Sequence, residues 1–345
     1  MKKIIGSIIA GIILSFTVLT DANAENNFLP YNEVRNFSEG LAPVSILKKN
    51  DKGIEFELYG FMDEKAKEVI APKYGDVGKF SEGLAKVQLE GKWGFIDQTG
   101  KLIVSNKYDQ ADKFKNGLAA VRKNGKWGYI NTKGKEVVKP QYDKAYAFSY
   151  NLGAVKKNGH WSYINKKGTA VIKTKYTSVK RFISGYAAIK HNGKWGYIDT
   201  KGNVVIQPQY KKVHSFYEGL AAVYKDEKWG FIDKNNHVKI KFKYEDITDF
   251  SEGLAGFQKN WHWGFIDKKG NVKIKNNYLQ IYSGFSEGFA SVMNRAENGG
   301  YIDQNGNAFP KFETDFVGYP FQNGKAIVNV GGDGQYYILK VLSLH

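Results

Sequence analysis

The 345-residue sequence contains no cysteine and only six histidines, and its 34 acidic residues are outnumbered by 51 lysines and arginines. Without cysteine the chain forms no disulfide and offers no thiolate to a metal ion or to a lipid anchor. The histidines do not occur in pairs at the spacing of metal ligands. We therefore expect no metal site and no cofactor.

Signals for catalysis are also scarce. No phosphate-binding loop ending in Gly-Lys-Ser/Thr occurs. A glycosidase needs two carboxylates at a fixed separation. The recurring aspartates precede x-x-Gly instead, or x-x-Asn in the copy with Asn236, which is typical of a turn: Asp97, Asp199, Asp233, Asp267 and Asp303. We predict that the protein is not an enzyme.

Helical patterning is missing after the first 24 residues. β-Branched and aromatic residues alternate with polar ones, and turn residues recur about every 8 to 12 residues, which favours an all-β protein. The segment 1–24 has Lys2 and Lys3, an apolar run and Ala22-Asn23-Ala24. This pattern predicts a secretory signal peptide cleaved after Ala24, with no further membrane-spanning segment in the mature protein.

The dominant feature of the sequence is an internal repeat of 34 residues. Tryptophan recurs at this spacing without insertion or deletion: Trp93, Trp127, Trp161, Trp195, Trp229 and Trp263. A fixed period of this kind indicates one supersecondary unit stacked on itself. Because each tryptophan shares a strand face with an aromatic residue two positions later, we expect all six in the core of the array.

Each unit predicts three strands. In the copy from Tyr108 to Pro140, a strand over 118–122 is followed by an Asn-Gly hairpin, a return strand over 127–130, a turn ending in Gly134 and a third strand over 136–139. Pro140 should end the third strand, since it cannot donate to a sheet. We interpret Gly128 as the seat for an aromatic ring of a neighbouring repeat.

The W-G-[FY]-I-D core, the F-S-E-G-L-A run and the P-x-Y element recur together from about Tyr31 to Asp303. On these motifs the chain resembles the WG-repeat (KWG-repeat) family of bacteria. The resemblance implies a β-rich repeat array, often secreted or associated with the cell envelope. It implies no catalytic residues.

Two architectures fit the unit. We predict an open superhelix, or solenoid, of three-stranded β-meanders, because a closed β-propeller needs four strands per blade and usually about 40 residues or more. The propeller remains the alternative. Within the array of 25–345, we expect an N-terminal capping repeat with a long hairpin (25–72), regular repeats (73–284) and divergent C-terminal repeats or a cap (285–345).

The net charge of +17 suggests a binding role. Lys126, Lys194 and Lys228 stand beside tryptophan in their copies and should form a ridge able to bind a polyanion with release of counterions. Alternatively they are solvated hairpin tips. Trp261 replaces the hairpin glycine of its copy. It either folds back onto its own repeat or serves as a stacking platform for a sugar or a protein.

These observations predict a non-catalytic exported repeat protein, secreted or periplasmic. It would act as a binding or scaffold module for an anionic envelope polymer, a glycan or a protein partner, and as a monomer. The alternatives are a structural spacer without a ligand of its own and, ranked last, a cell-wall hydrolase. Export argues against nucleic acid as the partner.

Overall fold

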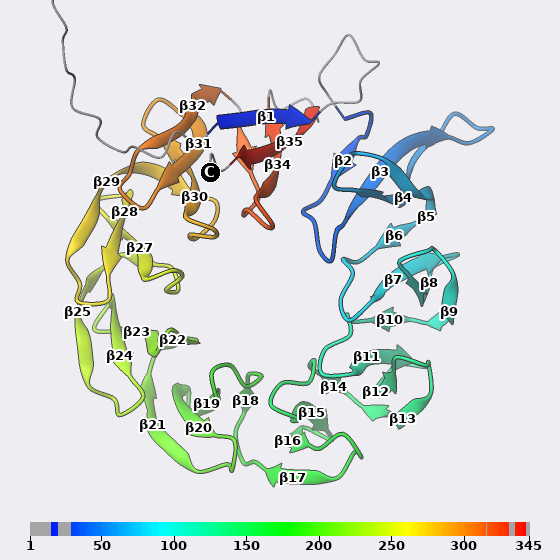
Figure 1. The fold of residues 1–345 in the computed structure, drawn as a ribbon. Coiled ribbons are helices and arrows are strands. Elements are labelled where there is room, and N and C mark those ends of the chain that lie inside the picture. The colour runs from blue at the N-terminus through cyan, green and yellow to red at the C-terminus, as the bar shows by residue number, and fades with distance from the viewer. Residues whose placement is uncertain (1–14, 20–28, 315, 331–334, 343–345) are drawn as a thin grey trace, which may run out of the picture.

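A computed structural model describes residues 15–19, 29–314, 316–330 and 335–342. Its strands form eight sheets, seven of four strands and one of seven. The sheets stand as blades around a ring, and the first and last lie beside each other (Figure 1). The all-β repeat architecture is confirmed. The open superhelix is wrong, because the blades close into a β-propeller.

Blades 1 to 8 follow the chain in order. Blade 1 contains β2 (Glu33–Val34), β3 (Leu41–Lys49), β4 (Glu55–Asp63) and β5 (Glu68–Tyr74), and blade 2 contains β6 (Asp76–Val77), β7 (Leu84–Leu89), β8 (Lys92–Asp97) and β9 (Leu102–Tyr108). Blade 3 contains β10 (Gln110–Ala111), β11 (Leu118–Lys123), β12 (Lys126–Asn131) and β13 (Glu136–Tyr142). Blade 4 contains β14 (Lys144–Ala145), β15 (Gly153–Lys157), β16 (His160–Ile164) and β17 (Ala170–Lys173). Blade 5 contains β18 (Ser178–Val179), β19 (Tyr186–His191), β20 (Lys194–Asp199) and β21 (Val204–Tyr210). Blade 6 contains β22 (Lys212–Tyr217), β23 (Leu220–Lys225), β24 (Lys228–Asp233) and β25 (Val238–Tyr244).

Blade 7 is a double blade, because β29 pairs with both β28 and β30. Its strands β26–β32 are Asp246–Ile247, Leu254–Lys259, His262–Asp267, Val272–Ile281, Phe289–Asn294, Asn298–Asp303 and Ala308–Thr314. Blade 8 combines β33 (Val317–Gly318), β34 (Lys325–Val330) and β35 (Gln335–Leu342) with β1 (Ser15–Leu19).

A propeller blade fits into 34 residues because its fourth strand is very short. In blade 3 the inner strand β10 contains only Gln110 and Ala111, which pair with Arg122 and Val121. The inner strands lie toward the ring axis and the third long strands lie at the rim (Figure 1). The sequence pattern predicted only three strands because a two-residue strand has no alternation to recognise.

The strand glycine serves a purpose other than the predicted one. A Cβ atom on Gly128 would lie 2.4 Å from the Val138 carbonyl oxygen and 2.7 Å from the Pro140 nitrogen. The register between β12 and β13 shifts there, so the rim strand bulges toward the glycine. The prediction of a neighbouring aromatic ring is therefore wrong. Pro140 lies within β13, at this bulge, rather than at its end.

Neighbouring blades pack face to face through buried aromatic rings. Phe95 of blade 2 contacts Phe114 of blade 3 edge-on, with ring centroids 4.8 Å apart. Tyr129 and Phe148 repeat this contact between blades 3 and 4 at the same distance. The hydrophobic core thus consists of similar layers between blades, each formed by two consecutive repeats.

The recurring aspartates form turns, as predicted. The Asp97 carboxylate accepts hydrogen bonds from the amides of Thr99 and Lys101, both at 3.0 Å. These contacts, led by the Thr99 hydroxyl, lower the pKa of Asp97. Gly100 closes the turn with a φ of +84°.

A set of polar contacts between repeats lies on the opposite side of the ring from the Asn-Gly hairpins. The serine of a Ser-Glu-Gly turn donates to a carbonyl oxygen of the next repeat, as Ser81 does to Phe114 at 2.8 Å. The glutamate accepts from amides of the next such turn, as Glu39 does from Glu82 at 2.7 Å and Gly83 at 2.9 Å. We call these contacts the serine latch and the glutamate latch.

The ring closes where blade 8 meets blade 1. Leu29, Val34 and Ala42 pack with Ile327 and Ile338 in one buried cluster. Lys325 forms an ion pair with Glu64 across the same junction. The terminal repeats therefore pack on each other and do not cap an open array.

The fourth strand of blade 8 comes from the predicted leader. β1 pairs antiparallel with β35 over Ser15–Leu19, which lies within 1–24. The predicted cleavage site at Ala24 lies outside the described residues. Within the described ranges, no helix has the length and apolar character needed to cross a membrane.

Candidate binding surface on the inner wall

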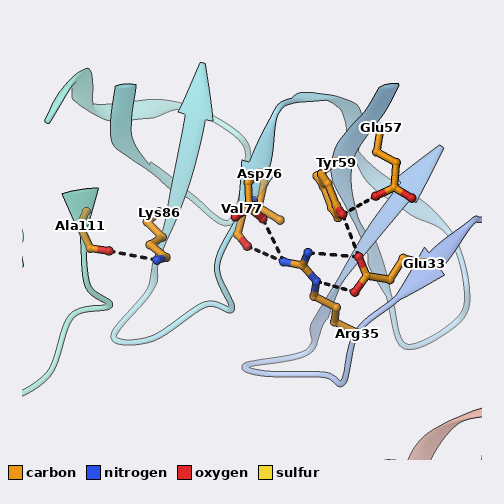
Figure 2. A network of polar contacts seen from close by, with 8 residues as sticks. All are labelled: Glu33, Arg35, Glu57, Tyr59, Asp76, Val77, Lys86 and Ala111. Carbon is orange, nitrogen blue, oxygen red and sulfur yellow. Dashed lines mark hydrogen bonds and ion pairs between the residues drawn. The ribbon is translucent and has the colours of Figure 1, made fainter. Parts of the chain in front are cut away.

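At most blade junctions, a side chain lies over the aromatic residue at the repeat tryptophan position. We call the surface of the blades that faces the ring axis the inner wall, and these covering side chains belong to it. In blade 1 the Arg35 guanidinium lies 4.6 Å from the Tyr59 ring centroid and donates to the Val77 carbonyl oxygen of blade 2 at 2.9 Å. In blade 2 the Lys86 ammonium lies 4.3 Å from the Trp93 ring and donates to the Ala111 carbonyl oxygen of blade 3. Figure 2 shows the Arg35 side chain beside Tyr59 and Val77, and the hydrogen bond from Lys86 to Ala111.

The cation of blade 1 is held by a network of carboxylates. Arg35 donates to Glu33 at 2.9 Å and to Asp76 at 3.1 Å (Figure 2). Burial opposes the charge of Arg35, but the hydrogen bonds to Glu33 and Asp76 outweigh it and raise the pKa of the guanidinium. This junction is therefore closed by paired charges.

Three later blades use other residues for the same purpose. Tyr146 stacks on Trp161 with centroids 5.3 Å apart. The Lys180 ammonium lies 5.4 Å from the Trp195 ring and donates to the Val213 carbonyl oxygen. His214 packs against Trp229 and hydrogen-bonds to Asp249. These three covering residues follow, or belong to, the inner strand of their blade, as Arg35 does, whereas Lys86 belongs to β7.

Blade 3 has no such cover. The position that Arg35 occupies in blade 1 is Asp112 here, and the position of Lys86 is Ala120. No ring or cation contact to Trp127 is found among the described residues, and its side chain is half-buried. We call the space around this indole the Trp127 cleft.

Two cavities meet at the Trp127 cleft. One cavity of about 310 Å³ is lined by seven residues of neighbouring repeats: Lys86, Trp93, Gln110, Ala111, Asp112, Trp127 and Ala145. The other, of about 360 Å³, is lined by Arg122, Trp127, Asp143, Lys144, Ala145 and Tyr146. A third cavity of about 340 Å³ begins at Asp112 and Tyr146 and extends to Lys180 and Arg181. Together they make a groove along the inner wall from blade 3 to blade 5.

Unpaired cations gather on the wall beside this groove. Lys79, Lys113, Lys115 and Arg181 form no ion pair within the described chain. Partial burial of its stem, then repulsion from Lys113 and Arg35, lowers the pKa of Lys79. Partial burial, then repulsion from Arg181 and Lys113, lowers the pKa of Lys115. We call these four residues the basic arc.

The same region lacks the latches. Lys115 and Asn116 stand where blade 2 has Ser81 and Glu82. Between consecutive repeats of the described chain, only the junction of blades 3 and 4 has neither a serine latch nor a glutamate latch; the others have at least one: Ser38, Ser81, Ser149, Ser184, Glu218, Ser251 and Ser286. The uncovered tryptophan and the open latch thus occur at one junction.

The predicted lysines lie elsewhere. Lys126, Lys194 and Lys228 follow hairpin tips, on the side of the ring opposite the latches. Lys126 is paired with Asp143 of blade 4 at 2.6 Å, as Lys92 is with Asp109. The row of tip lysines therefore includes ion pairs with carboxylates, whereas Asp112 and Glu82 attract Lys115 of the basic arc without forming an ion pair among the described residues.

Trp261 does not fold back onto its repeat, since 80% of its surface is exposed. Its amide donates to the Glu245 carboxylate at 3.1 Å, which holds the hairpin tip in place. The six repeat tryptophans are not equally buried: Trp93, Trp161 and Trp229 are in the core, and Trp127, Trp195 and Trp263 are half-buried.

The sequence of one turn matches a motif found in hydrolases. Gly284-Phe285-Ser286-Glu287-Gly288 matches G-x-S-x-G, in which serine acts as a nucleophile. Here Ser286 donates to the Phe321 carbonyl oxygen at 2.8 Å, and Glu287 accepts from the amides of Asn323 and Gly324. Both side chains serve as latches.

The basic arc and the Trp127 cleft were missed from the sequence. Two features of the sequence could have indicated them. Lys115-Asn116 replaces the Ser-Glu pair of other repeats, and one repeat position is Arg35 in blade 1, Asp112 in blade 3 and Lys180 in blade 5. Only the ring shows that this position covers a tryptophan.

The model of the family described as "WG containing repeat" matches residues 31–49, 59–93, 93–127, 127–161, 161–195, 195–229, 229–260 and 263–295. No curated protein matches the chain. Among solved structures, BamB from Moraxella catarrhalis is similar, with 12% identity, 96% of this chain and 99% of that chain covered, and a TM-score of 0.43. Hsv2 from Kluyveromyces lactis (9% identity, 69% and 98% covered, TM-score 0.42) and AztD from Citrobacter koseri (11%, 82% and 94%, TM-score 0.40) are also similar. At these values the likeness assigns no ligand or partner to this chain.

Proposed function

Because the chain belongs to the family of proteins built from WG-containing repeats, we propose that it is a non-catalytic binding protein that holds an anionic polymer on the inner wall of its propeller. The supporting observation is the basic arc, in which four cations from blades 2, 3 and 5 lie together and form no ion pair among the described residues. Gathering like charges is unfavourable in the free protein, and a bound polyanion relieves the repulsion.

The other parts of the proposal follow from the sequence. The leader-like segment 1–24 supports export, so the polymer belongs to the cell envelope or its surroundings. We expect the protein to act as a monomer in the periplasm or outside the cell. The turn aspartates and latch glutamates are engaged by backbone amides, which supports a role without catalysis.

A charge-matched comparison tests the proposal. One triple variant carries Lys79→Gln, Lys113→Gln and Arg181→Gln, and the other carries Lys126→Gln, Lys194→Gln and Lys228→Gln. Both lose three positive charges, but only the first loses three of the four cations of the basic arc. Binding of polyglutamate and of polygalacturonate is measured by calorimetry at two salt concentrations.

We expect the arc variant to bind at least about tenfold more weakly than the tip variant, with a smaller salt dependence, because fewer counterions are released. A larger loss in the tip variant would place the site on the hairpin ridge. If the unmodified protein binds neither polymer at low salt, the proposed function is wrong and a spacer role is favoured.

A further inference from the structure

We propose that the Trp127 cleft binds one sugar ring of an acidic glycan. The protein would then recognise the sugar rings of the anionic polymer as well as its negative charges. The inference rests on the proposed function and names the chemical class of its ligand. It is carried by the uncovered indole, the small side chain facing it, and an unpaired guanidinium at the same place.

The first observation is the space beside the indole. The inner-strand residue that faces the preceding blade's aromatic is Ala145 here, whereas blades 5 and 6 have Val179 and Val213. Ala145 and Trp127 line both cavities that meet in the cleft. An apolar aromatic wall with a few polar groups around it is the usual composition of a small-molecule site.

The second observation is the Arg122 side chain. Its Nε atom is buried and has no hydrogen-bond partner in the part of the chain that the structure describes. The equivalent residues Lys156 and Lys190 lie over Trp161 and Trp195, at 6.0 and 5.6 Å from the ring centroids. A buried donor without a partner is costly, and a ligand carboxylate would satisfy it with a charge-assisted bond.

The third observation is the mixture of polar groups around Trp127. Asp112 lies on one side of the indole, and Asp143 and Lys144 lie on the other. A sugar ring offers an apolar C–H face to the indole, hydroxyl donors to the carboxylates and, in an acidic sugar, a carboxylate to Arg122. An acidic peptide would bring its charges to the same aspartates with few donors to offset them.

The groove also explains how a longer chain would continue. The third cavity connects Asp112 and Tyr146 to Lys180 and Arg181. The Tyr146 ring is exposed and lines both this cavity and the one at Trp127. Successive sugar units would therefore run from Trp127 to the cation of the basic arc in blade 5.

Two substitutions test the cleft without removing the tryptophan. Ala145→Val copies the residue of blades 5 and 6 and fills the space, and Arg122→Gln removes the unpaired guanidinium. Lys156→Gln is the control, because it changes the equivalent position one junction away. The probes are polygalacturonate, which has carboxylated sugar rings, and polyglutamate, which has carboxylates without rings.

We expect Ala145→Val and Arg122→Gln each to weaken polygalacturonate binding at least about tenfold while polyglutamate binding stays within about twofold. The control should bind both polymers as the unmodified protein does. Circular dichroism confirms that the variants are folded.

Equal losses on both polymers, or no loss on either, would overturn the sugar site and leave the proposed function intact. So would an unmodified protein that does not distinguish the two polymers. If the unmodified protein binds neither, the proposed function itself fails.

Discussion

The junction between blades 1 and 2 has the same kind of aromatic core as the junction between blades 3 and 4. The two junctions differ in the polar contacts that join their blades. Phe61 and Phe80 meet edge-on at 4.8 Å in the first, as Tyr129 and Phe148 do in the second. The first adds the Arg35 network, a serine latch and a glutamate latch. The second has none of the three.

This difference shows that the apolar layer holds the blades together and that the polar contacts are separable from it. Burial of large aromatic side chains contributes several kcal/mol per junction, whereas each hydrogen bond contributes about 1 kcal/mol. A junction can therefore lose its cover and its latches without opening the ring. The surface so exposed becomes free to bind a ligand.

The largest expected effect separates buried from uncovered tryptophans. Trp161→Ala should lower the free energy of unfolding by about 3–5 kcal/mol, because the side chain is buried and stacked on Tyr146. Trp127→Ala should cost about 1–3 kcal/mol, since the indole is half-buried and makes no such contact. Urea denaturation monitored by circular dichroism measures both. Equal costs would mean that Trp127 is as well packed as Trp161.

The second prediction concerns ring closure. Ile338→Ala should cost about 2–5 kcal/mol, because Ile338 is fully buried in the cluster that joins blades 8 and 1. Deletion of residues 1–24 removes β1 but none of the side chains in that cluster, so a smaller loss is expected. Thermal unfolding compares the two, and small-angle scattering reports the shape. An elongated particle after the deletion would show that closure requires β1.

The third prediction transfers latches into the open junction. Lys115→Ser with Asn116→Glu should raise the free energy of unfolding by about 1 kcal/mol, through new bonds to blade 4. Asn116 already has the positive φ of the latch glutamates, 54° against 57° for Glu82. The reverse change, Ser81→Lys with Glu82→Asn, should lower stability by a similar amount. Chemical denaturation of both pairs tests whether the latches are interchangeable.

The smallest effect is expected from Lys126 and Asp143 at the edge of the cleft. The hydrogen bond from the Lys126 ammonium, followed by that from the Asn158 amide, holds the pKa of Asp143 below its ordinary 3.8. Because the folded-state pKa is lowered, the stabilisation is present above pH 3.8 and is lost as the pH falls through the folded-state value. Lys126→Met should raise the pKa of Asp143 in a carbon-detected NMR titration. An unchanged pKa would show that the pair is not formed in solution.

Several local features could be predicted from single positions. The Asn124-Gly125 hairpin, the Asp97 turn and the shared face of Trp127 and Tyr129 each depend on a few neighbouring residues, and the structure contains all three. The inner strand escaped prediction because Gln110 and Ala111 are paired by backbone contacts across the blade. The bulge at Pro140 escaped for the same reason, because it is a matter of register between two strands.

The residues of the candidate site are not part of any motif that the sequence analysis recognised. The tip lysines attracted attention because they adjoin tryptophan, but Lys126 is neutralised by Asp143 of the next repeat. Lys79, Lys113 and Arg181 occupy one repeat position, which becomes a basic surface only when that position faces the axis. Exposure of Trp261 was one of two predicted outcomes, and the structure selects it.

By itself the sequence determined the period, the antiparallel hairpins and the turns, because these follow from local backbone preferences and from alternation within one repeat. The tertiary structure decided whether the array closes, because closure depends on the rotation that each layer of packed aromatic rings imposes between neighbouring blades. It also decided which junction stays open. Whether a tryptophan is covered is determined by a side chain on a different strand, and by whether a partner for that side chain stands on the next blade.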